Sequence, residues 1–389
     1  MQIGIVQQSA DFIGGGELSL FELIHALKES GHKPFVIIPS RGEISKRLEK
    51  EKIPYVDHPF REWVVEPGVV RLTGGINRRI SYLFMEGNII ANAIRIKGLT
   101  PDLIITNTLN TPVGAFAALA MAIPHIWYIR EFGSLDVGYE YEIPEKMVYR
   151  LINKLSEHCI TNSRAVKYFV RNMGIDDEKI SVARQAVDVK PGRRVDLPGP
   201  QYYATFICVG RIEVSKGQLD AVKAVNIIKK KGTNTKLIIM GKVIKDWPDS
   251  IGYYNRIVKY IKKNKLENNI FFIGYKKNSS DYIKSSFATI VCSRNEAFGR
   301  VAIESMKLGI PVIGADSAGT AENITNRETG LLYEPGNPRH LAKKMMELSD
   351  DLDLYKSISE YSIKSSHDRF NKEIYGRCLS TIIDDMREY

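Results

Sequence analysis

Short apolar runs alternate with longer amphipathic stretches along the chain. In the first half, the apolar runs predict strands at IGIVQQ (3–8), PFVIIP (34–39), DLIITN (102–107), HIWYI (125–129) and HCITN (158–162). Between them, stretches such as 17–31 and 88–98 carry apolar residues at helical spacing. This order predicts parallel strands joined by right-handed helical crossovers, and such apolar strands suit a sheet that is covered on both faces.

The second half repeats the pattern with new members. Its apolar runs predict strands at TFICVG (205–210), KLIIMG (236–241), NIFFIG (269–274), ATIVCS (288–293) and PVIGAD (311–316). Helical stretches at 218–232 and 299–309 join them, and the proline- and glycine-containing segment 185–201 predicts a linker. The expected fold class is therefore α/β, with two doubly wound Rossmann-like domains that face each other across a cleft. Ligands of such sheets bind beyond the carboxyl ends of the strands.

Composition agrees with two folded domains. The chain has 389 residues, of which 44% are hydrophobic and 26% charged, as is typical of soluble globular proteins. Its four cysteines, Cys159, Cys208, Cys292 and Cys378, are far apart, and three lie in apolar runs. They predict buried reduced thiols, which suits a reducing cytosol. The first residues resemble a strand and not a signal peptide, and no uncharged apolar run is long enough to span a membrane. We therefore expect a cytoplasmic protein.

The chain is basic, with a net charge of +10 and a pI of about 9.2. Several of the basic residues fall within the first hundred positions. They fit a solvated basic surface, or one that attracts an anionic membrane or a phosphorylated acceptor. Nucleic-acid binding is a third alternative, but none of the usual nucleic-acid-binding motifs occurs, so we expect no nucleic-acid partner.

Two turns carry residues suited to an anionic ligand. Three consecutive glycines, Gly14 to Gly16, follow the first predicted strand and begin a helix, where backbone N–H groups attract anions. A flexible turn is the alternative. In VGRIEVSKG (209–217), Arg211 ends a strand and Lys216 begins a helix. Two cations at one strand–helix turn suit a diphosphate.

The segment SRNEAFGRVAIESMKLGIPVIG (293–314) carries two carboxylates. Glu296 ends a loop after a strand, and Glu304 lies one turn into the helix that follows. The backbone at the start of this helix supplies free N–H groups for phosphate oxygens. The two carboxylates suit ribose and sugar hydroxyls, although they could also be ordinary surface charges.

Glu296 and Glu304 bracket seven residues, and this segment resembles the E-x7-E motif of the retaining glycosyltransferases of the GT-B fold, especially family 4. The segments GGGE near the N-terminus, GH at Gly31–His32, VGR…SKG and TGLLYEPGNPRHLA (329–342) follow in the order and spacing of that family. The resemblance covers nearly the whole chain. It implies an acceptor-binding domain at 1–190, a nucleotide-sugar-binding domain at 200–365 and a C-terminal helical segment, 366–389, that packs back on the first domain.

The resemblance also implies roles for individual residues. Arg211 and Lys216 would bind the donor diphosphate, Glu304 the nucleotide ribose and Glu296 the transferred sugar. Phosphate and sugar would also meet the backbone of Phe298, Gly299, Arg300 and Val301.

The nucleotide base and the first domain contribute further expected contacts. Gly241 and the loop that contains Tyr275 and Lys276 would face the base. Gly15 and Gly16 would approach the donor phosphates from the first domain.

One departure from the family concerns the end of the strand HIWYI. The family often has a histidine near the reacting sugar, whereas this chain has Arg130 and Glu131. An arginine cannot act as a base, but it can stabilise phosphate or an acidic acceptor, and Glu131 can orient a hydroxyl. His125 is expected to be packed in the interior. A second departure is Gln185–Ala186, where relatives often have an asparagine–glycine turn.

The resemblance implies retaining transfer of a sugar from a UDP- or GDP-sugar to a hydroxyl of a glycan or lipid-linked acceptor, in the synthesis of cell-surface polysaccharide or glycoconjugate. We find no D-x-D motif of the kind that metal-dependent transferases use, although aspartate pairs occur at Asp176–Asp177 and Asp350–Asp351. Neither a metal nor a cofactor is therefore expected. The alternatives are a nucleotide-sugar epimerase of similar fold and a non-catalytic binding subunit. Acceptor contacts are expected in the loops 58–80 and 131–142, and the stretch 63–84 is predicted to contact a membrane or a lipid-linked acceptor, which would make the protein peripheral on the inner membrane face.

Overall fold

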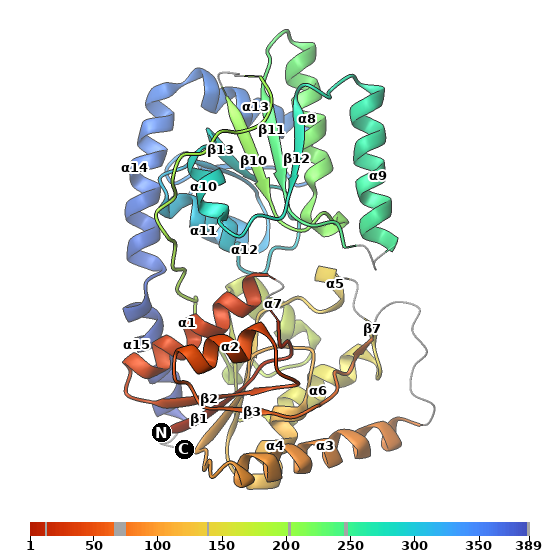
Figure 1. Cartoon of the computed structure of the whole chain (residues 1–389), viewed down its shortest axis with the longest axis vertical. Helices are drawn as coiled ribbons and strands as arrows, with labels where there is room; N and C mark the ends of the chain where they lie inside the picture. The colour runs from red at the N-terminus through yellow and green to blue at the C-terminus, as the bar shows by residue number, and fades with distance from the viewer. Residues whose placement is uncertain (12–13, 66–74, 138–139, 201–203, 245–247, 387–389) are drawn as a thin grey trace. The chain divides into compact units, whose positions relative to one another are not determined.

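The computed structural model describes the chain except residues 12–13, 66–74, 138–139, 201–203, 245–247 and 387–389 (Figure 1). Two compact units emerge. Unit 1 consists of Met1–Ala186 together with Asn371–Tyr389, and unit 2 is Val187–Phe370. Each contains a parallel sheet covered by helices on both faces, so the predicted α/β class with two Rossmann-like domains is confirmed. That these domains face each other across a cleft stays a prediction.

Unit 1 is built on a parallel sheet. Within the described residues this sheet has seven strands in the order β3-β2-β1-β5-β6-β8-β9. The strands are β1 Gln2–Val6, β2 Lys33–Ile38, β3 Tyr55–Asp57, β5 Leu103–Thr106, β6 His125–Ile129, β8 His158–Thr161 and β9 Ile180–Val182. A short antiparallel pair, β4 Val64–Val65 and β7 Glu140–Tyr141, lies outside it. The order reverses between β1 and β5, and such a reversal is where doubly wound sheets bind ligands.

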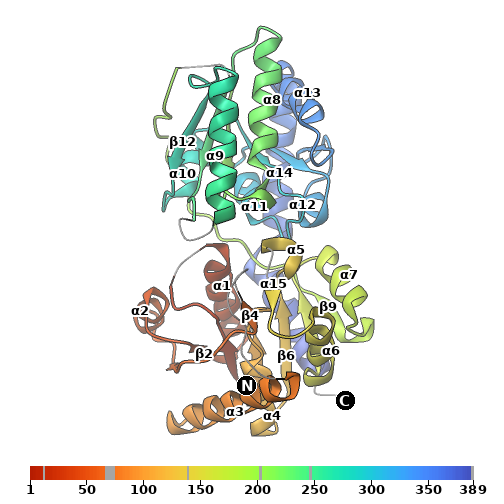
Figure 2. The same cartoon turned by 90° about the vertical axis from the view of Figure 1, so that its right-hand side faces the viewer.

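Both faces of this sheet are buried. On one face, strand residues pack against α1 (Gly15–Glu29), α2 (Glu43–Lys50) and α15 (Lys372–Asp385). On the other, they pack against α3 (Ile76–Ile96) and α4 (Val113–Met121), which lie side by side (Figure 2). The other helices of unit 1 are α5 Ser134–Val137, α6 Glu145–Leu155, α7 Arg164–Met173 and the 3-10 turn Asp177–Lys179.

Unit 2 repeats this architecture with a sheet in the order β12-β11-β10-β13-β14-β15 among the described residues. Its strands are β10 Thr205–Val209, β11 Lys236–Met240, β12 Ile270–Gly274, β13 Ala288–Val291, β14 Val312–Ala315 and β15 Leu331–Tyr333. All neighbours pair in parallel. The order reverses between β10 and β13, and their carboxyl ends carry most of the candidate donor residues.

Helices cover both faces of the unit 2 sheet as well. α8 (Gln218–Lys230), α9 (Pro248–Lys263) and α13 (Pro338–Asp350) pack on one face, while α10 (Ser279–Lys284) and α11 (Arg300–Lys307) pack on the other (Figure 1). The remaining helical segments are the 3-10 turn Val214–Lys216, α12 Ala318–Asn323 and α14 Leu352–Arg369.

The segment 185–201 contains neither helix nor strand among its described residues, as a linker should. Much of it nevertheless packs on unit 2. The Arg193 N–H donates to Asp281, the Val195 N–H donates to Ser285, and Val187 is buried with Phe370. The chain therefore passes between the units close to Ala186–Val187, and most of the predicted linker belongs to unit 2.

The C-terminal segment differs from the expected 366–389. α14 continues to Arg369 in unit 2 and has Phe370 as its C-cap. A separate helix, α15, starts at Lys372 with Asn371 as its N-cap. The side chain of Asn371 accepts a hydrogen bond from the Ile374 N–H and so begins a new helix. From there the segment belongs to unit 1.

The region expected to supply acceptor loops also differs from its prediction. Residues 66–74 lie outside the described part, but Trp63 is fully buried and stacks on Trp127 with ring centroids 5.5 Å apart. Residues 76–80 belong to α3, and α5 and β7 occupy parts of 131–142. Trp63 is therefore a core residue and not a surface contact.

The cysteines and the helix lengths bear on the expectations of buried thiols and of no membrane span. Cys159, Cys208 and Cys292 are buried and Cys378 is partly buried, and all are free thiols. In the described part of the chain, every helix is too short or too polar to cross a membrane.

Candidate donor site and similarity to known proteins

An ion pair joins the ends of β10 and β13. The Lys216 ammonium lies 2.8 Å from Glu296 Oε2. This contact requires a close approach of the two turns at Gly217, whose φ is +66° and where a Cβ would lie 2.5 Å from the Cys292 carbonyl oxygen. Since β10 and β13 are parallel neighbours, both residues lie at the carboxyl edge of the sheet, where its strand order reverses.

The pair is stabilised as ions. Burial acts to raise the pKa of the Glu296 carboxyl, but Lys216, the Ser293 side chain and the Gly299 backbone N–H together lower it below its usual value. Burial acts to lower the pKa of Lys216, but Glu296 raises it above its usual value. At neutral pH both side chains are therefore charged. The Gly299 N–H, expected to be free for a ligand, donates to Glu296 in this structure.

Arg211 has a carboxylate partner that the sequence did not single out. Its Nη2 lies 3.3 Å from Glu213 Oε1, which also accepts a hydrogen bond from Ser215. The other oxygen, Glu213 Oε2, is buried and has no hydrogen-bond partner among the described residues. Glu213 was missed because a carboxylate two residues after an arginine carries no signal until the turn brings it beside Lys216, whose pKa it also raises.

Glu304 is held by a neighbour on its own helix. Arg300 Nε donates to Glu304 Oε1 over 2.8 Å, and both side chains are mostly buried. Val301 is half-buried and packs on the core beneath α11. The Phe298 side chain is buried against Phe370, so its side chain supports the loop and only its backbone can meet a ligand. Gly299, with a φ of +79°, starts α11.

A second loop completes the surroundings of Glu296. The Gly319 N–H donates to the Glu296 carbonyl oxygen over 2.8 Å, and a Cβ on Gly319 would lie 2.6 Å from the Ala297 carbonyl oxygen. The Asn323 side chain donates to the Phe298 carbonyl oxygen. The turn into α12 therefore fixes the shape of the Glu296 loop, although the sequence pattern did not single it out.

The expected base-binding residues follow β11 and β12. Gly241 lies so close to Gly210 that a Cβ would reach within 1.8 Å of the Gly210 carbonyl oxygen. Tyr275 is exposed, with Lys242 Nζ 4.9 Å from its ring centroid. An exposed aromatic ring at this edge of the sheet can stack on a planar ligand.

In unit 1, Gly15 and Gly16 form the first turn of α1. Gly14 is its N-cap and donates its N–H to Glu17 over 2.8 Å, and a Cβ on Gly16 would meet nothing within 4 Å. The described residues therefore leave space beside Gly16. The Gly14 N–H already donates a hydrogen bond to the Glu17 side chain.

Arg130 and Glu131 follow β6 in unit 1. The Arg130 guanidinium lies 3.9 Å from the centroid of the Tyr128 ring, and it donates to Gln185 and, over 3.5 Å, to the hydroxyl of Tyr375. Gln185 and Arg130, which both depart from the family pattern, are therefore in contact with each other. Glu131 accepts the Arg130 backbone N–H over 3.0 Å, and burial raises the pKa of its carboxyl.

His125 is confirmed as an interior residue. It is 2% exposed, its Nε2 lies 2.8 Å from Thr106 Oγ1, and its Nδ1 lies 3.1 Å from Ser156 Oγ. Burial lowers its pKa to about 3, so the ring is neutral.

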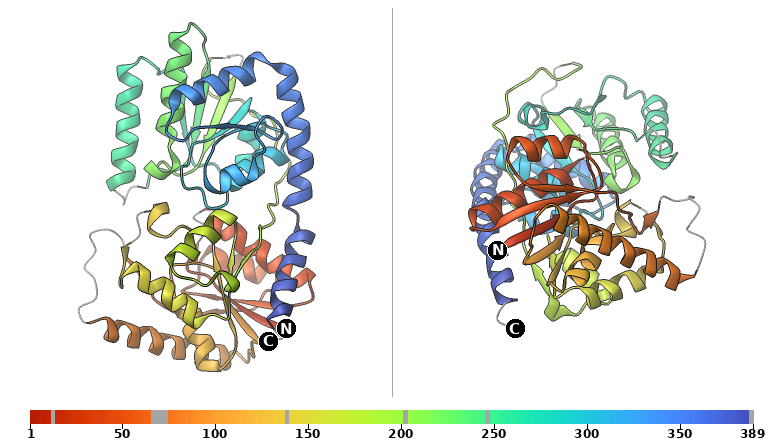
Figure 3. Two further views of the ribbon diagram at one scale, coloured as in Figure 1. Left: turned by 180° about the vertical axis from the view of Figure 1, so that it is seen from behind. Right: turned by 60° about the horizontal axis from the view of Figure 1, so that its bottom comes forward.

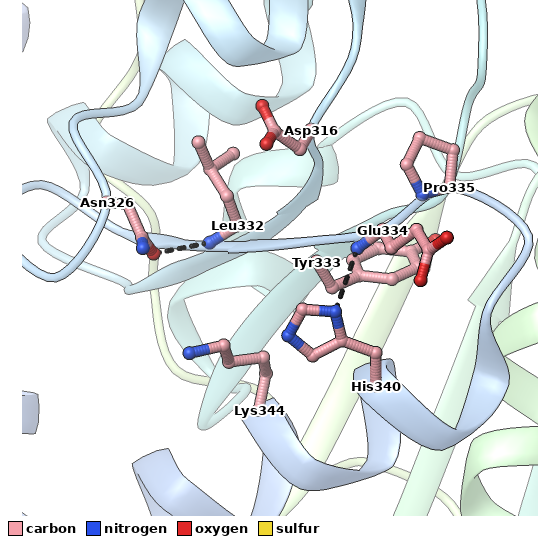
Figure 4. Close-up of a pocket in the computed structure, with 8 residues that line it drawn as sticks. All are labelled: Asp316, Asn326, Leu332, Tyr333, Glu334, Pro335, His340 and Lys344. Carbon is pink, nitrogen blue, oxygen red and sulfur yellow. Dashed lines mark hydrogen bonds between the residues drawn. The ribbon is translucent and has the colours of Figure 1, made fainter.

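A pocket of about 380 Å³ lies beside the edge strand β15 (Figure 4). Its lining residues are Asp316, Asn326, Leu332, Tyr333, Glu334, Pro335, His340 and Lys344. Two of the polar groups already bind the backbone, since Asn326 accepts from the Leu332 N–H and His340 from the Glu334 N–H. None of the sequence-predicted site residues lines it. Among the described residues, no group of acidic, histidine or cysteine side chains is arranged to hold a metal ion.

Comparison with known proteins defines the class of this two-unit structure. The Anabaena protein HepE, solved with UDP and glucose, superposes with a TM-score of 0.75 at 20% identity over 99% of this chain and all of that one. A glycosyltransferase from Rickettsia africae superposes with a TM-score of 0.76 at 22% identity over 99% of this chain and 98% of that one. The fold is thus the GT-B fold of two Rossmann-like domains.

The sequence comparisons give the family. Residues 13–190 match the model of Glycosyltransferase Family 4, and residues 194–365 match that of Glycosyl transferases group 1. The chain therefore belongs to the group 1 glycosyltransferases, a family of transferase enzymes.

Curated relatives agree at modest identity. The capsular polysaccharide glycosyltransferase CapM of Staphylococcus aureus is 27% identical over 60% of this chain and 57% of its own length. N-acetyl-alpha-D-glucosaminyl L-malate synthase of Bacillus anthracis is 28% identical over 39% of this chain and 38% of its own length. The chain thus spans less than two thirds of these two relatives. An uncharacterised glycosyltransferase of Methanocaldococcus jannaschii is 28% identical over 73% of this chain and 75% of its own.

Proposed function

We propose that this protein transfers a sugar, with retention of configuration, from a nucleoside diphosphate sugar to a hydroxyl of a glycan or lipid-linked acceptor. The observation that carries the proposal is the Lys216–Glu296 ion pair at the reversal point of the unit 2 sheet, with Arg211 beside it. CapM, named for capsular polysaccharide biosynthesis, supports an acceptor of the cell-surface polysaccharide type.

The cations of this site suit a diphosphate. Before a donor binds, Lys216 and Arg211 are matched by Glu296 and Glu213, so the four side chains together are neutral. The two carboxylates keep the cations oriented in a half-buried site. A donor diphosphate would take over part of their hydrogen bonding, and charge-assisted bonds of this kind are the strong ones in proteins.

The carboxylates suit the hydroxyl groups of the donor. Arg300 holds Glu304 in one orientation, so that the carboxylate can accept hydrogen bonds from ribose without a further loss of side-chain entropy. Glu296, whose lowered pKa keeps it ionised, would accept hydrogen bonds from the transferred sugar. The exposed ring of Tyr275 would stack on the base.

The reaction exchanges one bond at the anomeric carbon and transfers one proton. The bond between the anomeric carbon and the diphosphate oxygen breaks, and the acceptor oxygen bonds to the same face of that carbon. The acceptor proton passes to the departing diphosphate. Lys216, Arg211 and the N-terminus of α11 would stabilise the negative charge that grows on the diphosphate. A metal ion is not needed for that charge, and we propose metal-independent transfer.

Unit 1 would supply the acceptor side. Glu131 is held at the carboxyl end of β6, and its raised pKa makes it a stronger hydrogen-bond acceptor than an ordinary carboxylate. We therefore propose that Glu131 orients the acceptor hydroxyl. Arg130, held by Tyr128 and Gln185, would add positive charge behind it.

A thermal-shift panel tests the donor. UDP, GDP and TDP, free and as sugar conjugates, are added to the full chain, with UDP first because the HepE structures contain it. A ligand at about 100-fold its Kd stabilises the state it binds by about 2.7 kcal/mol, which raises Tm by roughly 5 °C or more. No shift with any nucleotide would remove the basis of the proposal.

Turnover separates the rival functions. Release of nucleoside diphosphate that depends on an added acceptor supports transfer. An epimerase would alter the sugar without an acceptor, and a binding subunit would show the thermal shift without release in every acceptor mixture.

A further inference from the structure

The outward face of α3 in unit 1 is apolar. Tyr82, Met85, Ile89 and Ile96 follow one another at spacings of three, four and seven, which places them on one line along a helix. Their exposed fractions are 39%, 57%, 45% and 85%. A helix that covers a sheet normally presents polar side chains to water, so the packing of unit 1 does not account for this stripe.

The opposite face of α3 is firmly seated. Leu83, Ile90 and Ile94 are buried. Gly87 faces α4 so closely that a Cβ there would lie 2.4 Å from Phe116 Cβ. Because the inner face is fixed in this way, the stripe of Tyr82, Met85, Ile89 and Ile96 faces outward as part of the rigid fold, and α3 and α4 lie side by side (Figure 3, orange).

The neighbouring helix α4 extends this apolar surface. Leu119 is 54% exposed. It precedes Ala120, whose carbonyl oxygen accepts a hydrogen bond from Arg95 of α3. An exposed leucine therefore lies beside the C-terminal part of α3, and the apolar surface involves both helices.

Most of the charges around the stripe are cations. Arg78 is exposed at one end, where its guanidinium lies over the Tyr82 ring, and Arg95 and Lys97 are exposed at the other end, where Lys97 Nζ lies 3.9 Å from Asp57 Oδ1. Glu86 is the one acidic residue in the sequence of α3, and its carboxylate is paired with Arg61. An apolar stripe with basic ends is the pattern of a helix that lies in the surface of an anionic bilayer.

We propose that the α3 stripe docks unit 1 on a membrane that contains anionic lipids, with Tyr82, Met85, Ile89 and Ile96 entering the apolar boundary and Arg78, Arg95 and Lys97 meeting the lipid phosphates. A second copy of the chain fits less well. A two-fold pair across this face would bring the same basic residues against each other, and like charges oppose such contacts. The inference goes beyond sugar transfer and does not depend on it.

Vesicle flotation with the full chain tests the docking. Vesicles of phosphatidylcholine mixed with phosphatidylglycerol should carry the protein upward, and vesicles of phosphatidylcholine alone should carry much less. Ile89→Glu should lower the partition coefficient at least about 10-fold, since a charge replaces an inserted side chain. Arg78→Gln with Arg95→Gln should lower it about 25-fold on the anionic vesicles alone, at roughly 5-fold per basic residue.

A matched control keeps the test specific. Tyr168 on α7 is 61% exposed, so Tyr168→Glu adds the same charge at another exposed apolar position of unit 1 and should leave flotation unchanged. Met85→Ser with Ile89→Ser should also weaken flotation while circular dichroism and Tm stay those of the parent chain. This milder pair guards against a variant that fails to fold.

Three results would overturn the proposal. The first is the absence of flotation with anionic vesicles at low salt, and the second is flotation that Ile89→Glu leaves intact. The third is a dimer seen by light scattering that Ile89→Glu dissociates, without vesicle binding, which would assign the face to a second copy. The nucleotide thermal shift is read separately, so failure here and failure of the proposed transfer remain distinct.

Discussion

Lys216 and Glu296 each counteract the effect of burial on the other. Taken out of water singly, either side chain would shift towards its neutral form, but as a pair both stay ionised. The stability that Glu296 gains from its lowered pKa is present at neutral pH and is lost as pH falls below the usual carboxylate value. The site is therefore ordered before a donor arrives.

Glu304 gives a direct test of the donor site. Glu304→Ala should weaken binding of the nucleotide that shifts Tm by roughly 10- to 100-fold, because a hydrogen bond to a charged group contributes about 1.5–3 kcal/mol. Calorimetric Kd values for parent and variant measure this.

Glu347→Ala is the matched control for Glu304. Glu347 is also a mostly buried carboxylate on a helix of unit 2, paired with Arg327 and Lys344. It should leave the nucleotide Kd unchanged. Equal Kd values for Glu304→Ala and the parent chain would remove Glu304 from the donor site.

His125 makes the stability of unit 1 depend on pH. Its pKa is about 3 in the folded chain and near 6.5 when unfolded, so the unfolded chain binds one proton more between these values. Its contribution is present above about pH 6.5 and is lost as pH falls, by about 1.4 kcal/mol per pH unit.

The variant His125→Asn isolates that contribution. Urea unfolding is followed by tryptophan fluorescence at several pH values from about 7 to 4.5. The free energy of unfolding of the variant should fall less steeply with decreasing pH than that of the parent chain, because the variant takes up about one proton fewer on unfolding. Parallel pH profiles for the two chains would contradict the assignment.

At the residue scale, the sequence predicted the residues that carry strong local patterns. Glu296, Glu304 and Lys216 lie in a motif, and the structure brings Glu296 and Lys216 into contact. Glu213 and Gly319 could not be predicted, because their place in the site depends on how separate turns pack against one another.

At the scale of elements, Gly87 in α3 and Gly252 in α9 form a natural comparison. Both are interior helix glycines, but a Cβ on Gly87 would lie 2.7 Å from the Phe116 backbone, whereas a Cβ on Gly252 would meet nothing within 4 Å. Gly252→Ala should stabilise the protein by up to about 1 kcal/mol through helix propensity. Gly87→Ala should destabilise it by about 1–3 kcal/mol, because α3 and α4 must separate.

Thermal or urea unfolding of both glycine variants measures this difference. If Gly87→Ala were as stable as Gly252→Ala, the close packing of α3 on α4 would be wrong. The fixed outward direction of the α3 stripe would then lose its support.

The elements that the sequence missed share a physical cause. The ten predicted strands are all present, but β3, β9 and β15 have three residues each and lie at or beside sheet edges, too short for a periodic signal. The first half of α3 was missed because apolar residues on its outer face obscure the helical pattern of its inner face. The apolar stripe on that outer face is the surface proposed to meet the membrane.

At the scale of the whole molecule, α15 completes the core of unit 1. Tyr375, Leu379, Ile382 and Ile383 are buried against the same sheet face as α1. Burial of each contributes about 1.5–3 kcal/mol, so together they match the whole stability of an ordinary domain, about 5–15 kcal/mol.

A chain that stops at Phe370 should therefore keep unit 2 and lose unit 1. In hydrogen exchange, amides of β10, β11 and β13 should stay protected, and those of β1, β2 and β5 should exchange rapidly. Continued protection of β1 would show that unit 1 is stable without α15. Tyr375→Phe in the full chain is the control, because it keeps the packing and removes only the hydroxyl contacts with Tyr128 and Arg130.

The division of unit 1 into two separated stretches of sequence has a consequence for the order of events on the ribosome. After Ala186 has been made, Val187–Phe370 must be synthesised before α15 exists, which takes roughly 10–40 s at about 5–20 residues per second. During this time the bare side of β1 and α1 can attract chaperones, while unit 2 emerges in one uninterrupted piece. A product cut short before residue 371 would keep that side uncovered, so proteases could recognise and remove it.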